Sequence, residues 1–394
     1  MLRDVYLTHG VRTPFGNYLG SLSGLKAGEL GAHAVKAALA RAGVNGKEVD
    51  EVYMGCVVQA GLGQNVARQS AIGAGLPASC GATTVNKVCG SSMRAVVIAA
   101  QTIQCDDAHL IVAGGAESMS NAPYFLRQAR TGYRMGDGPL VDGMIYDGLW
   151  DVYNDKHMGT CGDQLAAKYD ITRQQQDDYA IASFDRAVQA WENGFYNKEE
   201  VVPIEIKTRK ETILVEKDEE VSRYRGADKL RSLRPAFGAE GTVTAGNASG
   251  INDGAAAMLV FDDEAKTRLG IKPAARILGH SNHAQEPEWF GSAPIGALKK
   301  LSEKLSLPLS KVDLFEINEA FSVVALAAIK ELKLDHDKVN VAGGAVSIGH
   351  PIGASGARII NTLVRALEFH DKRIGMAAIC LGGGEASAIA VERC

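Results

Sequence analysis

The stretch that decides the fold is VNKVCGSSMRAVVIAAQTIQCDDAHLIVAGG, residues 85–115. Within it, Arg94 to Ile103 has the apolar, alanine-rich composition of a buried helix, and Ala108 to Ala113 is a short apolar run typical of a buried strand. A strand-like run also ends just before Cys89. A strand, a helix and a second strand in this order predict an α/β architecture with both faces of the sheet covered.

The same alternation extends in both directions from this stretch. Val49 to Val58 and the first residues, Met1 to Leu7, have the composition of strands, whereas Leu30 to Ala42 has helical spacing. Farther along, Gln174 to Trp191 has the spacing of an amphipathic helix, and Ala255 to Phe261 resembles another buried strand. A second α/β unit is therefore expected to follow and to run to the end of the chain.

The two halves of the sequence look like distant copies. Val49 to Met54 and Val312 to Ile317 share a Val-Asp start, and each half later has a strand that leads into glycines, at Ile111 to Gly115 and Ala378 to Gly384. The region from about Asn121 to Asn247 is richer in arginine, aromatic and polar residues. We predict two similar domains that face each other, with a large insertion in the first and a site at their seam.

Length and composition limit the possible classes of protein. The chain has 394 residues, of which 46% are hydrophobic and 22% charged, as expected for a globular protein of two or three compact units. A formal net charge of −4 argues against a general nucleic-acid binder, and no apolar run reaches the roughly 18 residues of a membrane span. The seven cysteines include no CxxC pair, so we expect reduced thiols, no metal site and a cytoplasmic protein without a signal peptide.

Cys89 is the first candidate for chemistry. It lies between a strand-like run and an apolar helix and is flanked by small residues, in NKVCGSSMR (residues 86–94). Free N–H groups at a helix N-terminus stabilise a thiolate, so we predict a lowered thiol pKa and a nucleophilic role. The alternative is a buried structural cysteine, which is the usual role of a lone cysteine.

Two further side chains could assist such a nucleophile. His350, between glycines in GGAVSIGHPIGASG (residues 343–356), could take a proton from Cys89 and form a thiolate–imidazolium pair; alternatively, it is a surface-loop histidine. Cys380 ends a buried strand ahead of LGGG (residues 381–384) and could act as an acid and a base, although a packing cysteine is the simpler interpretation. The glycines after it could offer backbone N–H groups as an oxyanion hole.

The segment NEAF (residues 318–321) follows a predicted strand at Asp313 to Ile317. Asn318 could orient a water or bind a carbonyl oxygen, and the alternative is a helix N-cap. Glu319 is expected to be a capping carboxylate near the start of a helix.

The combination of these stretches is far more specific than any one of them. NKVCGSSM, NEAF, GHPIGASGAR and CLGGG follow one another along the chain and resemble motifs of the thiolase family. VRTPFG (residues 11–16), GGAESMS (residues 114–120) and NASGINDGAAA (residues 247–257) resemble that family as well. The resemblance covers essentially the whole chain.

This resemblance implies a thiolase-like α/β fold of five layers, αβαβα, in which two similar domains carry an inserted loop domain. The N-terminal domain would comprise residues 1–120 and 248–272, the loop domain residues 121–247, and the C-terminal domain residues 273–394. Thiolases are dimers or dimers of dimers, so we expect a homo-oligomer, either a dimer or a tetramer. They catalyse the reversible Claisen condensation of acyl-CoA thioesters, with coenzyme A as a substrate and no further cofactor.

The resemblance also assigns roles to individual residues. Cys89 would accept the acyl group, and His350 would activate it and, with a water held by Asn318, bind the thioester oxygen. Cys380 would remove a proton from the second acyl-CoA or, in thiolysis, protonate the leaving enolate. The N–H groups of Cys89 and Gly382 would form a second oxyanion hole.

Coenzyme A binding would fall largely to the insertion. Arg223 resembles the family's arginine near the adenine, although it could also be a solvated charge. Ser249 resembles the serine that contacts the pantetheine arm, and His157-Met158 a motif of short-chain, biosynthetic members. The residues expected to line the substrate tunnel are Leu149, Phe237, Ala320 and Phe321.

Four departures from the family pattern, at Ser92, Phe290, Ala342 and Glu385-Ala386, bear on the acyl chain. The leading hypothesis is an enzyme that joins two acetyl-CoA molecules to acetoacetyl-CoA. A thiolase for longer or branched 3-ketoacyl chains in fatty-acid β-oxidation is the alternative within the family. Three other classes are disfavoured. A ketosynthase would use Cys-His-His, whereas the third group here is Cys380. A cysteine hydrolase would need an Asp or Asn to orient the histidine, and a non-catalytic coenzyme A-binding subunit would have lost its nucleophile.

Overall fold

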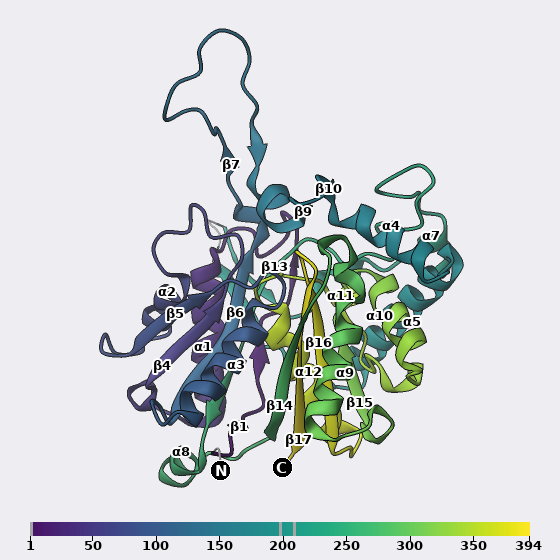
Figure 1. Ribbon diagram of the computed structural model, residues 1–394. Helices are drawn as coiled ribbons and strands as arrows, with labels where there is room; N and C mark the ends of the chain where they lie inside the picture. The colour runs from purple at the N-terminus through teal and green to yellow at the C-terminus, as the bar shows by residue number, and fades with distance from the viewer. Residues whose placement is uncertain (1–2, 197–198, 208–209) are drawn as a thin grey trace.

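The computed structural model describes residues 3–196, 199–207 and 210–394 (Figure 1). The strands of its central sheet are β1 (Tyr6–Leu7), β2 (Val11–Arg12), β3 (Gly16–Asn17), β4 (Glu51–Gly55), β5 (Gly81–Val85), β6 (Leu110–Ser118), β13 (Asn252–Phe261), β14 (Ala275–Ala284), β15 (Leu314–Ile317), β16 (Ile374–Leu381) and β17 (Glu385–Arg393). They are ordered β15-β16-β17-β14-β1-β13-β6-β4-β5, and β2 and β3 pair with β13. Strand β1, near the start of the described chain, and the C-terminal end of β17 lie toward the same edge of the molecule (Figure 1).

The strand order is symmetrical about the contact between β1 and β14. In the N-terminal half, β4 is parallel to β6, which is antiparallel to β13. In the C-terminal half, β15 is parallel to β16, which is antiparallel to β17. The prediction of two similar domains is therefore confirmed, because the two halves of the sheet repeat the same arrangement.

Helices cover the sheet on three levels. They are α1 (Ala27–Ala42), α2 (Val66–Gly73), α3 (Ser91–Gln104), α8 (Asp263–Leu269), α9 (Ala293–Leu305), α10 (Ser322–Leu332), α11 (Ala345–Ile348) and α12 (Ser355–Phe369). Helix α1 packs on β6 and β13 with α2 beside it, α9 packs on β14 and β17 with α10 beside it, and α3 and α12 pack together between the two halves (Figure 1). The layers follow the order αβαβα, as expected.

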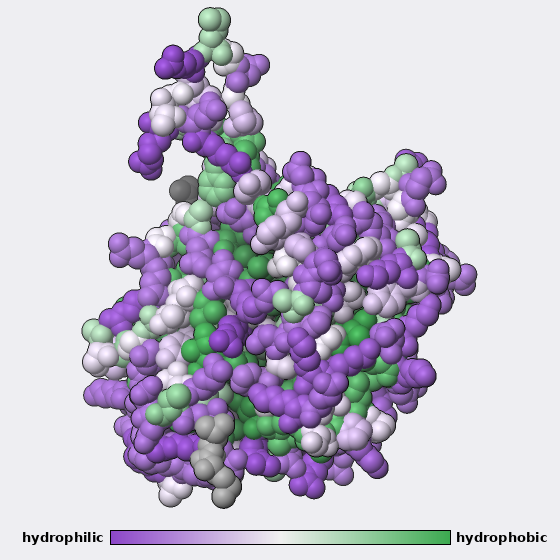
Figure 2. Space-filling view, in the orientation of Figure 1, coloured by the Kyte–Doolittle hydropathy of each residue, from purple (hydrophilic) through white to green (hydrophobic). Residues whose placement is uncertain are grey.

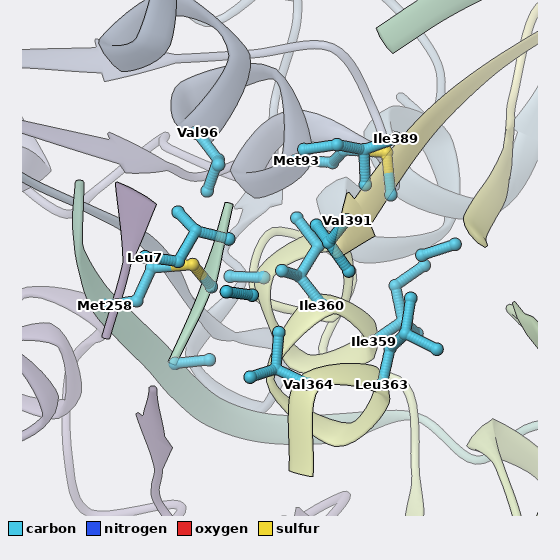
Figure 3. Close-up of a cluster of buried hydrophobic side chains, with 14 of the residues drawn as sticks. Leu7, Met93, Val96, Met258, Ile359, Ile360, Leu363, Val364, Ile389 and Val391 are labelled. Carbon is cyan, nitrogen blue, oxygen red and sulfur yellow. The ribbon is translucent and has the colours of Figure 1, made fainter. Parts of the chain in front are cut away.

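The central layer joins the two halves through a continuous apolar core. Figure 3 shows side chains from both halves converging there: Leu7, Met93, Val96, Met258, Ile359, Ile360, Leu363, Val364, Ile389 and Val391. Gly356 lets α12 approach α3 closely, since a Cβ on this glycine would lie 2.4 Å from the backbone nitrogen of Met93. The N-termini of these two helices therefore lie side by side.

A long segment leaves the sheet after β6 and returns at β13. It contains β7 (Tyr124–Phe125), β8 (Val141–Asp142), η3 (Ile145–Leu149), β9 (Trp150–Asp151), β10 (Lys156–His157), α4 (Met158–Lys168), α5 (Arg173–Glu192), β11 (Ile204–Lys207), β12 (Thr212–Val215), α6 (Glu219–Arg223) and α7 (Ala227–Arg231). The β7–β8 hairpin projects far from the body of the molecule, whereas α4 and α5 pack against the C-terminal half (Figure 1). The 3₁₀ helices are η1 (Gly46–Glu48), η2 (Met119–Asn121), η4 (Pro287–Ser292), η5 (Leu309–Lys311) and η6 (His336–Lys338).

The strand expected at Val49 to Val58 is shorter in the structure. Only Glu51 to Gly55 forms β4, because the backbone N–H groups of Val57 and Val58 bind the carboxylate of Glu117 and not a neighbouring strand. The strand expected at Met1 to Leu7 is limited to Tyr6 and Leu7, and its first two residues lie outside the described part of the chain. Within the described ranges, none of the helices has the length and apolar character needed to cross a membrane.

Candidate active site

Cys89 lies in the turn between β5 and α3. Val88 adopts the left-handed conformation with φ 47°, and Gly90 is the N-cap residue of α3. The hydroxyl of Ser91 fixes this turn, since it accepts from the N–H of Lys87 at 2.9 Å and donates to the carbonyl of Val88 at 2.6 Å. The structure thus places the thiol at a helix N-terminus.

Cys380 approaches Cys89 from the C-terminal half. It lies near the end of β16, before the turn Gly382–Gly384 that leads into β17. The sulfur of Cys89 is within hydrogen-bonding reach of its own N–H and of the N–H of Gly382, and the two thiols are close enough to interact electrostatically. The two N–H groups proposed for an oxyanion hole therefore converge on one sulfur.

His350 is buried, and both of its ring nitrogens have neighbours. Its backbone N–H donates to Asn252 Oδ1 at 2.8 Å, Nδ1 lies 2.6 Å from Ser355 Oγ, and Nε2 lies 3.5 Å from Asn318 Nδ2. Ser355 Oγ also donates to the carbonyl of Pro351 at 2.9 Å. Because that bond uses the only hydroxyl hydrogen, we assign the ring proton to Nδ1, which leaves Nε2 as the basic nitrogen.

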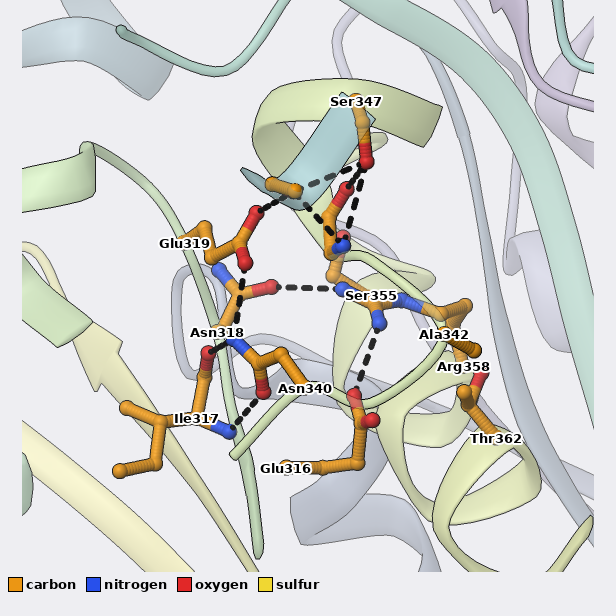
Figure 4. Close-up of polar contacts among 12 residues, drawn as sticks. Glu316, Ile317, Asn318, Glu319, Asn340, Ala342, Ser347, Ser355, Arg358 and Thr362 are labelled. Carbon is orange, nitrogen blue, oxygen red and sulfur yellow. Dashed lines mark hydrogen bonds and ion pairs between the residues drawn. The ribbon is translucent and has the colours of Figure 1, made fainter. Parts of the chain in front are cut away.

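Asn318 is not a helix cap. The N-cap of α10 is Phe321, and the side chain of Asn318 points instead toward the buried end of α12. Its Oδ1 accepts from Arg358 Nη2 at 3.2 Å, and Nη1 of the same guanidinium lies 3.3 Å from Glu316 Oε2 (Figure 4). The N-cap alternative for Asn318 is therefore wrong.

Glu319 does not cap α10, the helix that follows it, so that expectation is also wrong. Its buried carboxylate accepts hydrogen bonds from Tyr179 Oη at 2.9 Å and Ser183 Oγ at 2.8 Å on α5. It also accepts from Asn340 Nδ2 at 2.9 Å (Figure 4) and from the N–H of Val346 at 3.1 Å. Glu319 thereby joins the insertion to α11, the short helix that precedes His350.

Burial opposes charge on the reactive groups and so disfavours the predicted thiolate–imidazolium pair in the resting protein. Burial raises the pKa of the Cys89 thiol to about 12 and outweighs the N–H of Gly382, which acts to lower it. Burial also raises the pKa of Cys380 well above its ordinary value. Burial, with a smaller effect of the Arg358 charge, lowers the pKa of His350 to about 3. The helix N-terminus alone was thus a poor guide to the state of the thiol, because desolvation is the larger effect.

Glu117 is a functional candidate that sequence reasoning missed. It is buried in β6, and its carboxylate accepts from the N–H groups of Val57 at 2.9 Å, Val58 at 3.1 Å and Gly353 at 2.9 Å. It therefore ties the loop after β4 to the loop that carries His350, and burial raises its pKa to about 7. A carboxylate in an otherwise apolar, fully buried strand is the signal that could have revealed it.

A cavity of about 380 Å³ opens beside Cys89. One side of it is formed by Val88 and Gly382, which flank the two reactive cysteines, and the other by the insertion. Its lining residues are Val57, Asn86, Val88, Tyr146, Asp147, Gly148, Trp150, Asp151, Val152, Tyr153, Met158, Gly382 and Gly383. The site thus lies at the seam of the two halves, under the insertion.

Several residues expected to bind coenzyme A gather near this cavity. Met158 lines it, and His157 stacks on Phe237 with ring centroids 4.6 Å apart. Phe237 in turn meets Phe321 edge to face at 6.3 Å. Ser249 Oγ donates to the carbonyl of Ala320 at 2.9 Å, next to Phe321.

The remaining two predicted binding residues lie apart from this group. Leu149 packs on the opposite wall, in an apolar cluster that includes Val58 and Ile352 and also touches Cys89. Arg223 is exposed at the end of α6, and its guanidinium lies 2.9 Å from the Asn17 side-chain oxygen when that amide faces it. The structure therefore brings Phe237, Ala320 and Phe321 together, leaves Leu149 in a separate cluster, and does not bring Arg223 to the cavity.

Two of the departures from the family pattern lie near the site. Phe290 contacts Phe321 with centroids 6.4 Å apart, so it supports the tunnel wall. Glu385 forms an ion pair with Lys87, which links the turn of Gly382 to the turn of Cys89. In the described part of the chain, no cluster of three or more His, Cys, Asp or Glu side chains is arranged to hold a metal ion.

Comparison with known proteins identifies the family. Residues 5–264 match the family described as Thiolase, N-terminal domain, and residues 271–393 match Thiolase, C-terminal domain. The chain belongs to the thiolase family. It is accordingly an acyltransferase. A non-catalytic subunit would have lost its nucleophile, whereas this thiolase keeps Cys89, His350 and Cys380.

The similarity extends along the whole thiolase chain. It is 52% identical to acetyl-CoA acetyltransferase 2 of Arabidopsis thaliana, over 99% of this chain and 97% of the relative. It is 48% identical to a cytosolic acetyl-CoA acetyltransferase of Gibberella zeae, over 99% and 98% of the two chains. Among solved structures, the Acat5 thiolase of Ascaris suum in complex with coenzyme A matches with a TM-score of 0.93 at 44% identity, over 100% of both chains.

Proposed function

We propose that this thiolase catalyses the reversible condensation of two acetyl-CoA molecules to acetoacetyl-CoA and coenzyme A through an acyl-Cys89 intermediate. The observation that carries the proposal is the convergence of Cys89, Cys380 and the N–H of Gly382 on one point beside the cavity. The basic Nε2 of His350 faces Asn318, and Ile352, two residues farther along the chain, belongs to the apolar cluster against which Cys89 packs. A nucleophile, a base and a second thiol are the groups that a two-step acyl transfer needs.

In the first half-reaction, the sulfur of Cys89 attacks the thioester carbonyl while its proton passes to Nε2 of His350. The developing oxyanion would be bound by the N–H groups of Cys89 and Gly382, which in the resting protein point to the sulfur of Cys89. The bond to coenzyme A breaks, and the departing thiolate takes the proton of Cys380. The products are acyl-Cys89, an imidazolium at His350 and a thiolate at Cys380.

In the second half-reaction, the Cys380 thiolate takes a proton from the methyl group of the second acetyl-CoA. The enolate oxygen is stabilised by the His350 imidazolium and the water that Asn318 would hold, and its carbon attacks the acyl group on Cys89. The carbon–sulfur bond breaks, and Cys89 recovers its proton from His350. Each reactive group thus returns to its neutral starting state.

The direct test is thiolysis of acetoacetyl-CoA by coenzyme A, compared with a 2-methyl and a longer 3-ketoacyl-CoA. Preferred turnover of acetoacetyl-CoA supports the proposal, whereas preference for a longer or branched chain would keep the mechanism and overturn the substrate. A lack of turnover with every substrate would overturn the enzymatic function itself. Cys89→Ala should lose both turnover and covalent acylation, and Cys105→Ala, at an exposed cysteine away from the site, is the matched control.

We also propose that residues 121–247 form the loop domain that binds coenzyme A, between an N-terminal domain of residues 1–120 and 248–272 and a C-terminal domain of residues 273–394. The aromatic wall of His157, Phe237 and Phe321 supports this assignment. For Arg223 the proposal requires movement of its guanidinium away from Asn17 toward the adenine. Binding of coenzyme A to Arg223→Ala, measured by calorimetry, tests that residue separately.

We further propose a cytoplasmic homo-oligomer, either a dimer or a tetramer. Within the described residues, β5 pairs only with β4, so one edge of the sheet is open to a second copy. The projecting β7–β8 hairpin exposes Tyr124, Leu126, Met135 and Leu140, and apolar residues are visible at its stem in Figure 2. The cytosolic relative named above supports the compartment. Sedimentation velocity, with and without residues 126–140, would measure the number of copies and the part played by the hairpin.

A further inference from the structure

Asn318 can contribute a donor to the active site only in one of its two amide orientations. A rotation of the amide by 180° exchanges Nδ2 and Oδ1 with little change in shape. In one orientation Nδ2 faces Nε2 of His350, at 3.5 Å. In the other, a carbonyl oxygen would face the same place, where it could not donate a hydrogen bond to a water or an oxyanion.

The structure contains one group that distinguishes these orientations. Arg358 Nη2 donates to Asn318 Oδ1 at 3.2 Å, and a guanidinium has only donors, so it cannot bind the NH₂ end of an amide (Figure 4). Arg358 and Asn318 are both buried, with side chains shielded from competing water. Charge-assisted hydrogen bonds are stronger than neutral ones, and more so in a dry interior.

The position of the guanidinium is itself fixed. Nη1 is held by Glu316, two residues before Asn318 on β15, at 3.3 Å. Arg358 lies in the first turn of α12, three residues after Ser355, whose hydroxyl contacts Nδ1 of His350. One helical turn therefore determines which nitrogen of His350 is basic and which end of Asn318 faces it.

We propose that Arg358 is a positioning residue for the reaction, because it makes Asn318 present its amide N–H groups to the water that binds the substrate oxygen. This inference rests on the proposed function. It adds one requirement to the reactive residues themselves, namely that the amide of Asn318 is held in one orientation. Arg358 touches neither substrate nor the reacting atoms in this arrangement; it acts through Asn318.

The test is a double-mutant cycle of Arg358→Met and Asn318→Ala, measured by thiolysis of acetoacetyl-CoA. Loss of one preorganised donor costs about 100-fold in kcat, so we expect roughly that loss for Asn318→Ala and about 10- to 100-fold for Arg358→Met, with KM changed less than about threefold. The double variant should be no more than about threefold worse than Asn318→Ala, because the two changes remove the same interaction. Losses that multiply in the double variant would overturn the proposal.

Two further variants separate positioning from folding. Glu316→Gln keeps an oxygen for Nη1 and leaves the bond to Asn318, so its kcat should remain within about threefold of wild type. Arg358→Lys retains a buried donor and should recover part of the activity lost in Arg358→Met. If Arg358→Met does not fold, Arg358→Lys and its double variant with Asn318→Ala complete the same cycle.

Acylation of Cys89 by acetyl-CoA, followed by mass spectrometry, gives a readout that does not need the Asn318 donor. It should persist in Arg358→Met, whereas its loss would show that Arg358 acts on the nucleophile and would overturn the proposal. A wild-type protein that neither acylates nor turns over acetoacetyl-CoA would contradict the proposed function and not this inference specifically.

Discussion

Gly356→Ala should separate the effect of helix packing on catalysis from its effect on stability. A Cβ at this position would lie 2.4 Å from the backbone nitrogen of Met93, about 1 Å closer than an ordinary contact between nonbonded atoms. No side-chain rotation relieves a clash with backbone, so α12 and α3 must separate. Overpacking of this kind costs about 2–3 kcal/mol, and the better helix propensity of alanine returns about 1 kcal/mol, for a net loss of about 1–2 kcal/mol.

The catalytic effect should be larger than this loss of stability. The N-terminus of α3 follows Cys89, and the N-terminus of α12 carries Ser355, which contacts His350. A displacement of about 1 Å between reacting groups can reduce the rate by about 100-fold. We therefore expect kcat for thiolysis to fall by about that factor in a protein that still folds at room temperature.

The assay is steady-state thiolysis beside urea unfolding of the same preparation. Gly24→Ala is the matched control, because a Cβ there would meet nothing within 4 Å, and both its activity and its stability should match wild type. Ser92→Ala removes the 2.9 Å hydrogen bond to the N–H of Ala357 without forcing the helices apart, and it should reduce kcat less. Wild-type kcat in Gly356→Ala would refute the idea that the contact between α3 and α12 sets the geometry of the site.

The remaining predictions concern the reactive groups, the buried carboxylate and the aromatic wall. Cys380→Ser should still form acyl-Cys89 but lose condensation, and full condensation activity would remove Cys380 from the mechanism. Alkylation of Cys89 by iodoacetamide should rise about tenfold per pH unit up to pH 9, because burial raises the thiol pKa to about 12; a plateau near pH 7 would contradict this. Burial raises the pKa of Glu117 to about 7, so in the folded protein this group keeps a proton that the unfolded chain releases. Its contribution to stability is therefore present at low pH and is lost as the pH rises to about 7. In Glu117→Gln the unfolding free energy should depend less on pH between about pH 5 and 7 than in wild type, and identical slopes would oppose this. The stack of His157 on Phe237 should give a coupling of about 0.5–1.5 kcal/mol in KM for coenzyme A between His157→Ala and Phe237→Ala, and additive effects would show that the stack does not serve binding.

Features that depend on neighbouring residues were predictable from the sequence. The helix expected at Gln174 to Trp191 is α5, Arg173–Glu192, and its start follows from the capping box of Thr172 and Gln175. Cys89 at the start of a helix and Cys380 at the end of a strand also follow from their immediate surroundings, since apolar runs and glycines mark both boundaries. The repeated sheet could be predicted because each half carries its own copy of the pattern.

Features that depend on distant contacts could not be predicted in this way. Glu117 meets Gly353 from the other half of the chain, and no local pattern indicates that bond. Glu319 was misassigned because α10 begins only at Ser322, which leaves the carboxylate free to reach α5. A lowered pKa was predicted for Cys89 because neighbouring residues reveal the helix N-terminus. The burial that instead raises this pKa comes from the packing of both halves, which neighbouring residues do not reveal.

A neutral resting state explains how a half-buried thiol, Cys89, and a buried one, Cys380, can take part in one reaction. If Cys89 were a thiolate at rest, Cys380 nearby would be still harder to ionise, because a negative charge on Cys89 raises the pKa of Cys380. Burial avoids this by keeping Cys89, Cys380 and His350 uncharged until a thioester carbonyl is present to receive the nucleophile. Protons then pass between the substrates, Cys89, His350 and Cys380, and the reaction takes no proton from bulk water. The same burial strengthens the fixed donors of Gly382 and Asn318, because a hydrogen bond to a developing oxyanion is worth more where water cannot compete. A site that suppresses charge at rest and stabilises it only once the substrate is bound therefore depends on the orientation of those donors as well as on the reactivity of the cysteine.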